Sequence, residues 1–220
     1  MSSRDHIFSK LRSAQKPFTE VPPIEQWRHM VPQAAQMSPA ELQVLFMQEL
    51  DLLGCTVYCP PDDEDAIAHI LEMLEGDEKV LSWEETYLPL GGLHDALAAN
   101  GVTVAAYNDG NVRVGVTGVA AALAATGSLL LSSGEGRYRL TSLLPDLHIA
   151  VVDAAQIVAD FETWIAQQKA AGLPAFHDAS NTFLITGPSK TADIAQILIK
   201  GAHGPRKVHV VLMNSSVRTT

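Results

Sequence analysis

A segment near the C-terminus, "ITGPSKTADIAQILIKGAHGP" (185–205), places glycines, hydroxyls and a lysine before an apolar stretch. We interpret it as the end of a strand, a turn, a helix over 190–200 and a second turn. Free backbone N–H groups at the start of a helix attract anions, and Lys190 adds a positive charge. The pattern therefore suggests a site for a carboxylate or phosphate, the alternative being a capped helix with a surface lysine.

A second segment, "TGSLLLSSGEGRYRLTSLLPDLHI" (126–149), offers further groups that could bind an anion. Thr126, Gly127 and Ser128 open an apolar strand, where the glycine permits a close backbone approach and the hydroxyls can donate hydrogen bonds. Arg137 projects from the loop "GEGR", and its guanidinium could clamp an anion with two hydrogen bonds. The alternative for Arg137 is a surface salt bridge.

Common motifs of nucleotide binding and hydrolysis explain neither segment. A P-loop requires G-x-x-x-x-G-K-[ST], but Ser189 precedes Lys190, and Leu184 stands where the first glycine should be. A dinucleotide fingerprint needs a third glycine, which "GEGRYR" lacks. The chain also has no G-x-S-x-G nucleophile elbow. We therefore assign no catalytic residue from a motif.

The histidines and cysteines show no spacing typical of a metal site. His148 lies in an apolar strand, where a structural histidine is more common than a catalytic one. Cys55 and Cys59 are the two cysteines, whereas structural zinc and iron–sulfur sites usually need four ligands. We expect no bound metal, two cysteines buried in a strand, and a reducing cytoplasm as the compartment.

The elements that must position these residues alternate between strand and helix. Several strands are apolar throughout, which is typical of strands covered on both faces. The sequence thus predicts an α/β fold with three layers around an open, mostly parallel sheet. Strands are expected at 55–59, 78–83, 102–107, 112–118, 128–133, 147–153, 181–187 and 207–214, and helices at 2–15, 38–54, 61–76, 93–101, 119–127, 153–172 and 190–200.

Composition limits the classes of partner. With 47% hydrophobic residues among 220, the chain can build a full core, and the net charge of -10 comes without any run of Lys or Arg. Neither nucleic acid nor an anionic membrane surface is therefore expected as a partner. No apolar run is long enough to insert into a membrane, and no secretory signal is present. We place an N-terminal helix and extended arm in 1–37 and the α/β domain in 38–220.

The stretches "GVTG", "AATGSLLLSSGEGRYRLTSLLPDLHIAVV" and "FLITGPSKTADIAQILIKGAHGPRKVHVVL" together resemble the lactate-utilization protein C family (LutC, also YkgG), whose members carry a LUD domain. The resemblance implies a NagB/RpiA/CoA-transferase-like fold and a part in the bacterial oxidation of L-lactate to pyruvate. It also implies partner proteins that hold iron–sulfur clusters, since this chain lacks the cysteines for them. No cofactor bound directly to the chain is expected.

The resemblance also assigns residues to a ligand site. Where family members usually have an acidic residue before Thr-Gly, this chain has Ala125. The ligand-binding residues that the resemblance implies are Thr126, Gly127, Ser128, Arg137, His148, Gly187, Ser189, Lys190, Thr191 and His203.

Two functions agree with these observations. The first is a component of an L-lactate utilization system that binds a small organic acid or a phosphate-bearing ligand and docks with iron–sulfur proteins. The second is an autonomous acyl- or CoA-transferase-like enzyme, for which Glu135 in the arginine loop is the candidate nucleophile. The sequence leaves open whether the chain is an enzyme and whether it forms a homo-oligomer.

Overall fold

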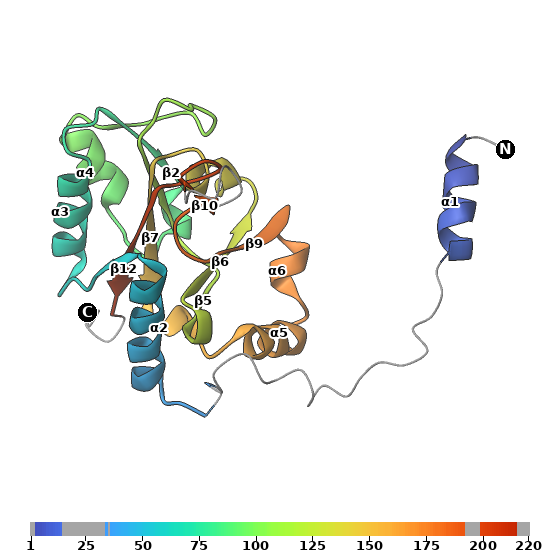
Figure 1. The fold of residues 1–220 in the computed structure, drawn as a ribbon. Coiled ribbons are helices and arrows are strands. Elements are labelled where there is room, and N and C mark those ends of the chain that lie inside the picture. Colours follow the sequence, from blue (N-terminus) through green and yellow to red (C-terminus); the bar gives the residue numbers. More distant parts are fainter. Residues whose placement is uncertain (1–2, 15–33, 35, 192–198, 215–220) are drawn as a thin grey trace. The chain divides into compact units, whose positions relative to one another are not determined.

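The computed structural model describes residues 3–14, 34, 36–191 and 199–214, which fall into two compact units, Met1–Pro32 and Gln33–Thr220. In the first unit, α1 (Ser3–Ala14) confirms the helix expected over 2–15 (Figure 1). The arm expected over 16–37 lies almost entirely outside the described residues. The boundary between residues 37 and 38 remains a prediction.

Six strands of the larger unit form one sheet, in the order β1-β12-β7-β4-β2-β3 (Figure 1). Every pairing in it is parallel, which confirms the mostly parallel sheet that the apolar strands predicted. The strands are β1 (Thr56–Tyr58), β12 (Lys207–Met213), β7 (Leu147–Asp153), β4 (Val114–Thr117), β2 (Lys79–Ser82) and β3 (Thr103–Val104).

The helix α2 of the larger unit begins where the sequence supplies a cap. Ser38 accepts a hydrogen bond from the backbone of Glu41 and the Glu41 side chain accepts one from Ser38 N, so α2 (Pro39–Leu53) starts with a capping box. Gly54 ends that helix in the left-handed conformation. The other helices are α3 (Asp63–Met73), α4 (Leu93–Ala99), α5 (Phe161–Ala170) and α6 (Pro174–His177), of which α6 was not predicted.

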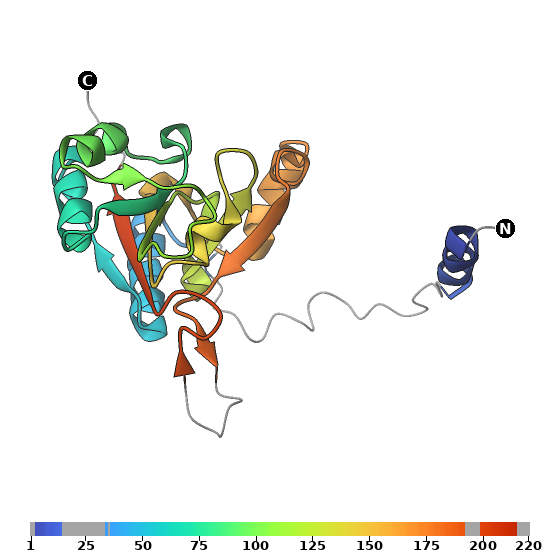
Figure 2. The same cartoon turned by 90° about the horizontal axis from the view of Figure 1, so that it is seen from above.

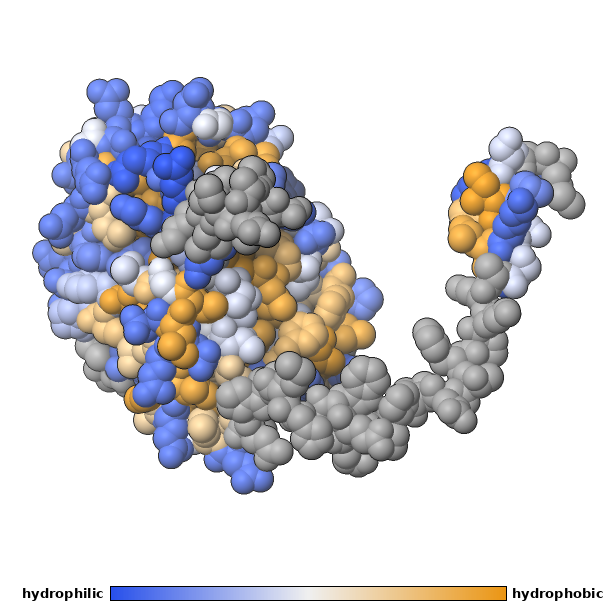
Figure 3. Space-filling model, in the orientation of Figure 1, coloured by the Kyte–Doolittle hydropathy of each residue, from blue (hydrophilic) through white to orange (hydrophobic). Residues whose placement is uncertain are grey.

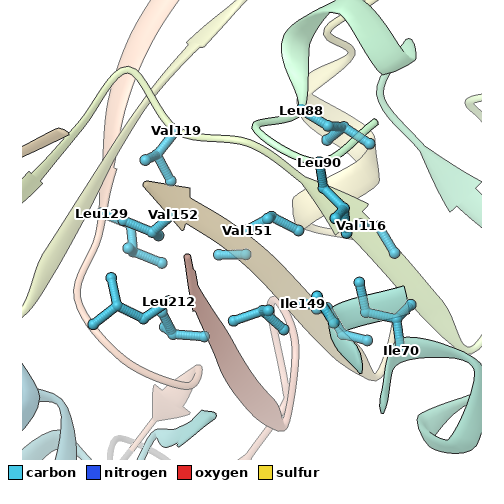
Figure 4. Close-up of a cluster of buried hydrophobic side chains, with 14 of the residues drawn as sticks. Ile70, Leu88, Leu90, Val116, Val119, Leu129, Ile149, Val151, Val152 and Leu212 are labelled. Atoms are coloured by element: carbon cyan, nitrogen blue, oxygen red, sulfur yellow. The ribbon is translucent and has the colours of Figure 1, made fainter. Parts of the chain in front are cut away.

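The two faces of the parallel sheet are covered differently. The register places Ile149 and His209 on one face, which α3 and α4 cover (Figure 1). Val152 and Leu212 lie on the opposite face and belong to the same buried cluster as Leu129, which comes from a second sheet (Figure 4). Both faces are therefore buried, as the apolar strands require.

The second sheet has four strands in the order β8-β5-β6-β9. Its central strand β6 pairs antiparallel with β5 and β9, and β5 pairs parallel with β8. Leu130 and Trp164 of α5 form a separate small cluster on the outer side of this sheet. The strands are β8 (Ile157–Val158), β5 (Ala121–Leu123), β6 (Ser128–Ser133) and β9 (Asn181–Ile185).

The prediction of a helix over 119–127 is wrong. Residues 121–123 form β5, and Ala124–Thr126 form a 3-10 turn. Alanine favours helices in isolation, but β5 has a hydrogen-bonded neighbour on each side and is fully buried. Two of its three residues are alanines that fit between packed layers, so tertiary pairing overrides the local preference.

The prediction of one long helix over 153–172 is wrong for the first half of that segment. Asp153 caps a 3-10 turn, and the next residues form β8, which pairs with β5. Asp160 then accepts a hydrogen bond from Thr163 N and starts α5. The apolar side chains that suggested one helix therefore belong to a strand and a shorter helix.

The helix expected over 190–200 is not formed at either of its ends. β10 (Lys190–Thr191) and β11 (Ile199–Lys200) pair antiparallel and project from the domain (Figure 2), and residues 192–198 lie outside the described part. Ser189 N donates to Pro205 O, and Gly201 N donates to Ser189 O. These bonds hold the segment extended and use backbone groups that a helix start would have left free.

Exposed apolar side chains occur in several places on the surface, one of them over α5 and α6. Figure 3 shows hydrophobic residues over α5 and α6, where Phe161, Phe176 and nearby Leu184 of β9 are 42%, 46% and 48% exposed. Among the described helices, none combines the length and apolar character needed to cross a bilayer.

Candidate functional site

The loop that carries Arg137 is a tight turn attached to the end of a parallel strand. Gly134 and Arg137 exchange two backbone hydrogen bonds of 3.1 Å each, and Gly136 adopts a φ of +71° that favours glycine. Gly136 O accepts a hydrogen bond of 2.9 Å from Glu84 N, two residues beyond β2. The turn is therefore fixed at the carboxyl end of the parallel sheet.

The guanidinium of Arg137 includes a buried donor without a protein partner. The group lies over the ring of Tyr87, 4.6 Å from its centroid, and Nη2 donates to Asp178 O at 3.0 Å. Its Nε is buried and has no hydrogen-bond partner in the protein. Buried donors are rarely left unpaired, so this atom is suited to meet a ligand or a bound water.

Arg137 lines a cavity of about 70 Å³. Trp83 follows β2 and Val119 follows β4, so the cavity lies beyond the carboxyl ends of parallel strands, where open α/β sheets usually bind ligands. Trp83 Nε1 donates to Tyr138 O at 3.1 Å, which fixes one wall. The lining residues are Trp83, Tyr87, Val119, Ala120, Ser132 and Arg137.

The hydroxyls of the Thr-Gly-Ser segment hydrogen-bond to one another and to the end of β9. Thr126 Oγ1 lies 2.8 Å from Ser128 Oγ, which lies 2.8 Å from Thr186 Oγ1. The structure thus brings together the two distant segments that the sequence singled out. Their contact is a hydroxyl chain within the protein, and Arg137 is not part of it.

Two glycines and Lys190 of the predicted site meet the last turns of α2. A Cβ on Gly127 would lie 2.9 Å from the carbonyl carbon of Glu49, and one on Gly187 would lie 3.1 Å from Leu53 Cβ. Lys190 Nζ donates to Leu53 O at 2.7 Å, which satisfies a carbonyl at the helix end. These residues position α2 against both segments.

The other residues of the C-terminal motif lie elsewhere. Ser189 directly precedes β10, and Thr191 lies in β10. His203 is exposed and lines an open hollow of about 570 Å³, with Arg113, Asp146 and Arg206. These three residues directly precede β4, β7 and β12, so the hollow and the Arg137 cavity lie at opposite edges of the parallel sheet.

His148 lies in the core, as a strand histidine usually does. Its Nε2 is 2.8 Å from Thr117 Oγ1 on the neighbouring strand, and its Nδ1 is buried without a partner. Burial lowers the pKa of His148 to about 4. The side chain is therefore neutral near pH 7 and does not line the Arg137 cavity.

A pair of histidines was missed by the sequence analysis. His209 Nε2 lies 3.0 Å from His69 Nε2, and His209 Nδ1 lies 2.6 Å from Thr56 Oγ1. Burial, together with the nearby His69, lowers the pKa of His209 to about 4. Their separation of 140 positions leaves no local spacing, and only the alternation in β12 could have placed His209 on an inward face.

The prediction that both cysteines are buried strand residues is right only for the burial of Cys55, and neither cysteine lies in β1. Cys55 is buried before β1, and burial raises the pKa of its thiol to about 11, whereas Cys59 is exposed beyond the strand. The strand ends at Tyr58, which places Cys59 outside the sheet. In the described part of the chain, no three His, Cys, Asp or Glu side chains are arranged to hold a metal ion.

Comparison with known proteins places the chain in a family. The LUD domain matches residues 44–213, which is most of the chain. The chain belongs to the LUD domain family. This assignment agrees with the resemblance inferred from the Thr-Gly-Ser and Gly-Pro-Ser-Lys-Thr segments.

Individual relatives of this LUD protein are moderately similar. It is 31% identical to Lactate utilization protein C of Macrococcus caseolyticus over 68% of this chain and 67% of that protein. It is also 31% identical to Lactate utilization protein C of Halalkalibacterium halodurans, over 68% of this chain and 68% of that protein. An uncharacterized protein of Neisseria meningitidis is 37% identical over 46% of this chain, which spans less than half (42%) of that relative's length.

A solved structure supports the fold of this LUD protein. A DUF162 family protein from Deinococcus radiodurans aligns with 80% of this chain and 99% of its own length, with a TM-score of 0.52 and 21% identity. At that identity the comparison concerns the fold alone.

Gly127→Ala is expected to destabilise the LUD domain strongly. Gly127 has a φ of +60°, and the added Cβ would also lie about 3 Å from the backbone of Glu49 and Leu50. Gly76→Ala is the matched control, since Gly76 has a φ of +89° and open space around it. Urea denaturation should give Gly127→Ala a loss of unfolding free energy about 1–3 kcal/mol larger than that of the control. Equal losses would contradict the packing role.

Acid should destabilise the LUD domain through its two buried histidines. The folded pKa values of His148 and His209 are lowered from 6.5 to about 4, so the unfolded state binds their protons first as the pH falls. The unfolding free energy is therefore unaffected by the titration of these histidines above pH 6.5. As the pH falls toward 4, it decreases by about 1.4 kcal/mol per pH unit for each histidine.

His209→Asn tests this pH dependence by its slope. Between pH 6.5 and 4.5, the unfolding free energy should fall with pH in both proteins. The slope of the variant should be smaller than that of the wild type by about 1.4 kcal/mol per pH unit. His203→Asn, at an exposed position, is the control and should keep the wild-type slope. An unchanged slope in His209→Asn would argue against the buried neutral imidazole.

Proposed function

We propose that this chain is a component of a bacterial L-lactate utilization system, in which L-lactate is oxidised to pyruvate. The support is its membership of the LUD domain family and its similarity to proteins named Lactate utilization protein C. Because the aligned region spans about two thirds or less of these relatives, the activity of the whole system is part of the proposal.

The chain's own task in this proposal is to bind a small organic acid at Arg137. The observation that carries it is the buried Nε of Arg137, a charged donor without a protein partner beside a small cavity. Stacking on Tyr87 and the bond to Asp178 O hold the guanidinium in place before a ligand arrives. A pre-positioned donor loses little side-chain entropy on binding, which favours affinity.

Electron transfer in this system is assigned to iron–sulfur partner proteins. The chain has two cysteines, and Cys55 is buried with its thiol protonated near pH 7. We place the complex in the cytoplasm, where such clusters and free thiols are stable. A tagged full-length chain purified from lactate-grown cells should bring down iron–sulfur proteins. Absence of such partners, together with normal growth of a deletion strain on lactate, would reject this role.

An autonomous acyl- or CoA-transferase-like enzyme remains the alternative. Its candidate nucleophile, Glu135, is exposed at the tip of the turn and does not line the Arg137 cavity. Glu135→Ala should therefore leave acid binding unchanged, whereas loss of a measured transferase turnover in that variant would favour the alternative.

Arg137→Ala should weaken binding of L-lactate and pyruvate to the purified protein. Loss of a hydrogen bond to a charged group costs about 1.5–3 kcal/mol, which is roughly 10- to 150-fold in Kd measured by calorimetry. Arg139→Ala is the control, because Arg139 is exposed over the ring of Phe183 and does not line the cavity. Equal affinity in Arg137→Ala and the wild type would remove the assigned site.

A further inference from the structure

We infer that the Arg137 cavity selects short monocarboxylic acids with an oxygen on carbon 2, and that Ser132 recognises this oxygen. The ligand class is thus the 2-hydroxy and 2-oxo acids. This inference rests on the proposed function, because it names the substrate class of the same site.

The charge of the lining limits the ligand to one carboxylate. Arg137 is the one charged side chain among the lining residues, and its Nη2 already donates to Asp178 O. A second carboxylate would lie against Val119, Ala120 or the aromatic rings without a cation. Burying an unpaired charge is costly, so dicarboxylic acids should bind poorly.

The size of the cavity limits the length of the ligand. Its volume of about 70 Å³ compares with roughly 10–15 Å³ needed to admit one water, so it has room for a few heavy atoms. Trp83 is held by its bond to Tyr138 O, and Tyr87 lies beneath the guanidinium. Because the Trp83 wall is held in place and the volume is small, an acid of two or three carbons fits best.

Ser132 supplies a hydroxyl with unused hydrogen-bonding capacity. It is 4% exposed and lies on β6, five residues before Arg137. Its nearest hydroxyl neighbour is Thr182 Oγ1 at 3.5 Å, the outer limit of a hydrogen bond, and Thr182 itself donates to Ala175 O at 3.2 Å.

A hydroxyl suits both members of the proposed ligand class. It can accept from the hydroxyl of a 2-hydroxy acid and donate to the carbonyl of a 2-oxo acid. Ser132 is the one aliphatic hydroxyl among the lining residues, while Arg137 receives the carboxylate. A buried polar group left unpaired by the wrong ligand is the usual source of strong selectivity, so an acid without the second oxygen should bind less well.

Calorimetry with L-lactate, pyruvate, propionate and malonate tests the selection. The wild type should bind L-lactate and pyruvate at least tenfold more tightly than propionate, and malonate should bind no better than propionate. In Ser132→Ala the Kd values for propionate and L-lactate should differ by no more than about twofold. This loss of selectivity should come chiefly from weaker binding of L-lactate. Ser133→Ala should keep the wild-type ratio of these two Kd values. This neighbouring serine is also buried, but its hydroxyl donates to Asn181 O and it does not line the cavity.

The outcomes separate this inference from the proposed function. If no acid binds the wild type, or if Arg137→Ala binds all acids as the wild type does, the proposed function fails and the inference with it. If acids bind through Arg137 but the wild type does not discriminate against propionate or malonate, the selection fails alone. That comparison needs no variant, so it holds even if Ser132→Ala does not fold. Retention of the wild-type ratio in a folded Ser132→Ala overturns the role of Ser132.

Discussion

The packing of the four-stranded sheet against the parallel sheet is the constraint on which the rest of the structure depends. Leu129 of β6 belongs to the same buried cluster as Val152 and Leu212 of the parallel sheet (Figure 4). This contact sets the course of β6 across the larger sheet. Because β6 leads directly into the turn at 134–137, the same contact delivers Arg137 to the carboxyl ends of β2 and β4.

The polar residues near this packing divide into two groups. Thr126, Ser128 and Thr186 satisfy one another, and Lys190 satisfies a carbonyl at the end of α2. These groups hold a helix between two distant chain segments and keep little capacity for a ligand. Arg137 differs, because a buried nitrogen of its guanidinium has no protein partner. The Thr-Gly-Ser segment and Lys190 thus have structural contacts, and the proposed ligand contact is in the turn.

The proposed function assigns acid binding to the small cavity beside Arg137. In the proposed system, binding of the acid and transfer of its electrons belong to different chains. Such a division requires contact surfaces on the LUD domain, and exposed apolar side chains gather over α5, α6 and β9 (Figure 3). The buried histidines on both faces of the parallel sheet are neutral near pH 7, so the scaffold gains no buried charge there.

The sequence by itself determined the parallel sheet, the helices over 3–14 and 39–53, and the caps of α2. It also singled out the glycine-rich loop that carries Arg137, the residue of the proposed site. These features follow from local patterns, namely apolar runs, a capping box and a glycine-rich loop. Tertiary structure alone decided that the alanine-rich segment 121–123 forms a strand, that residues 190–191 and 199–200 pair as a hairpin, and that His69 meets His209. In each of these cases the deciding interaction is with a strand, a layer or a side chain outside the local segment. Such an interaction can override the local preference for helix, and no short window of sequence contains it.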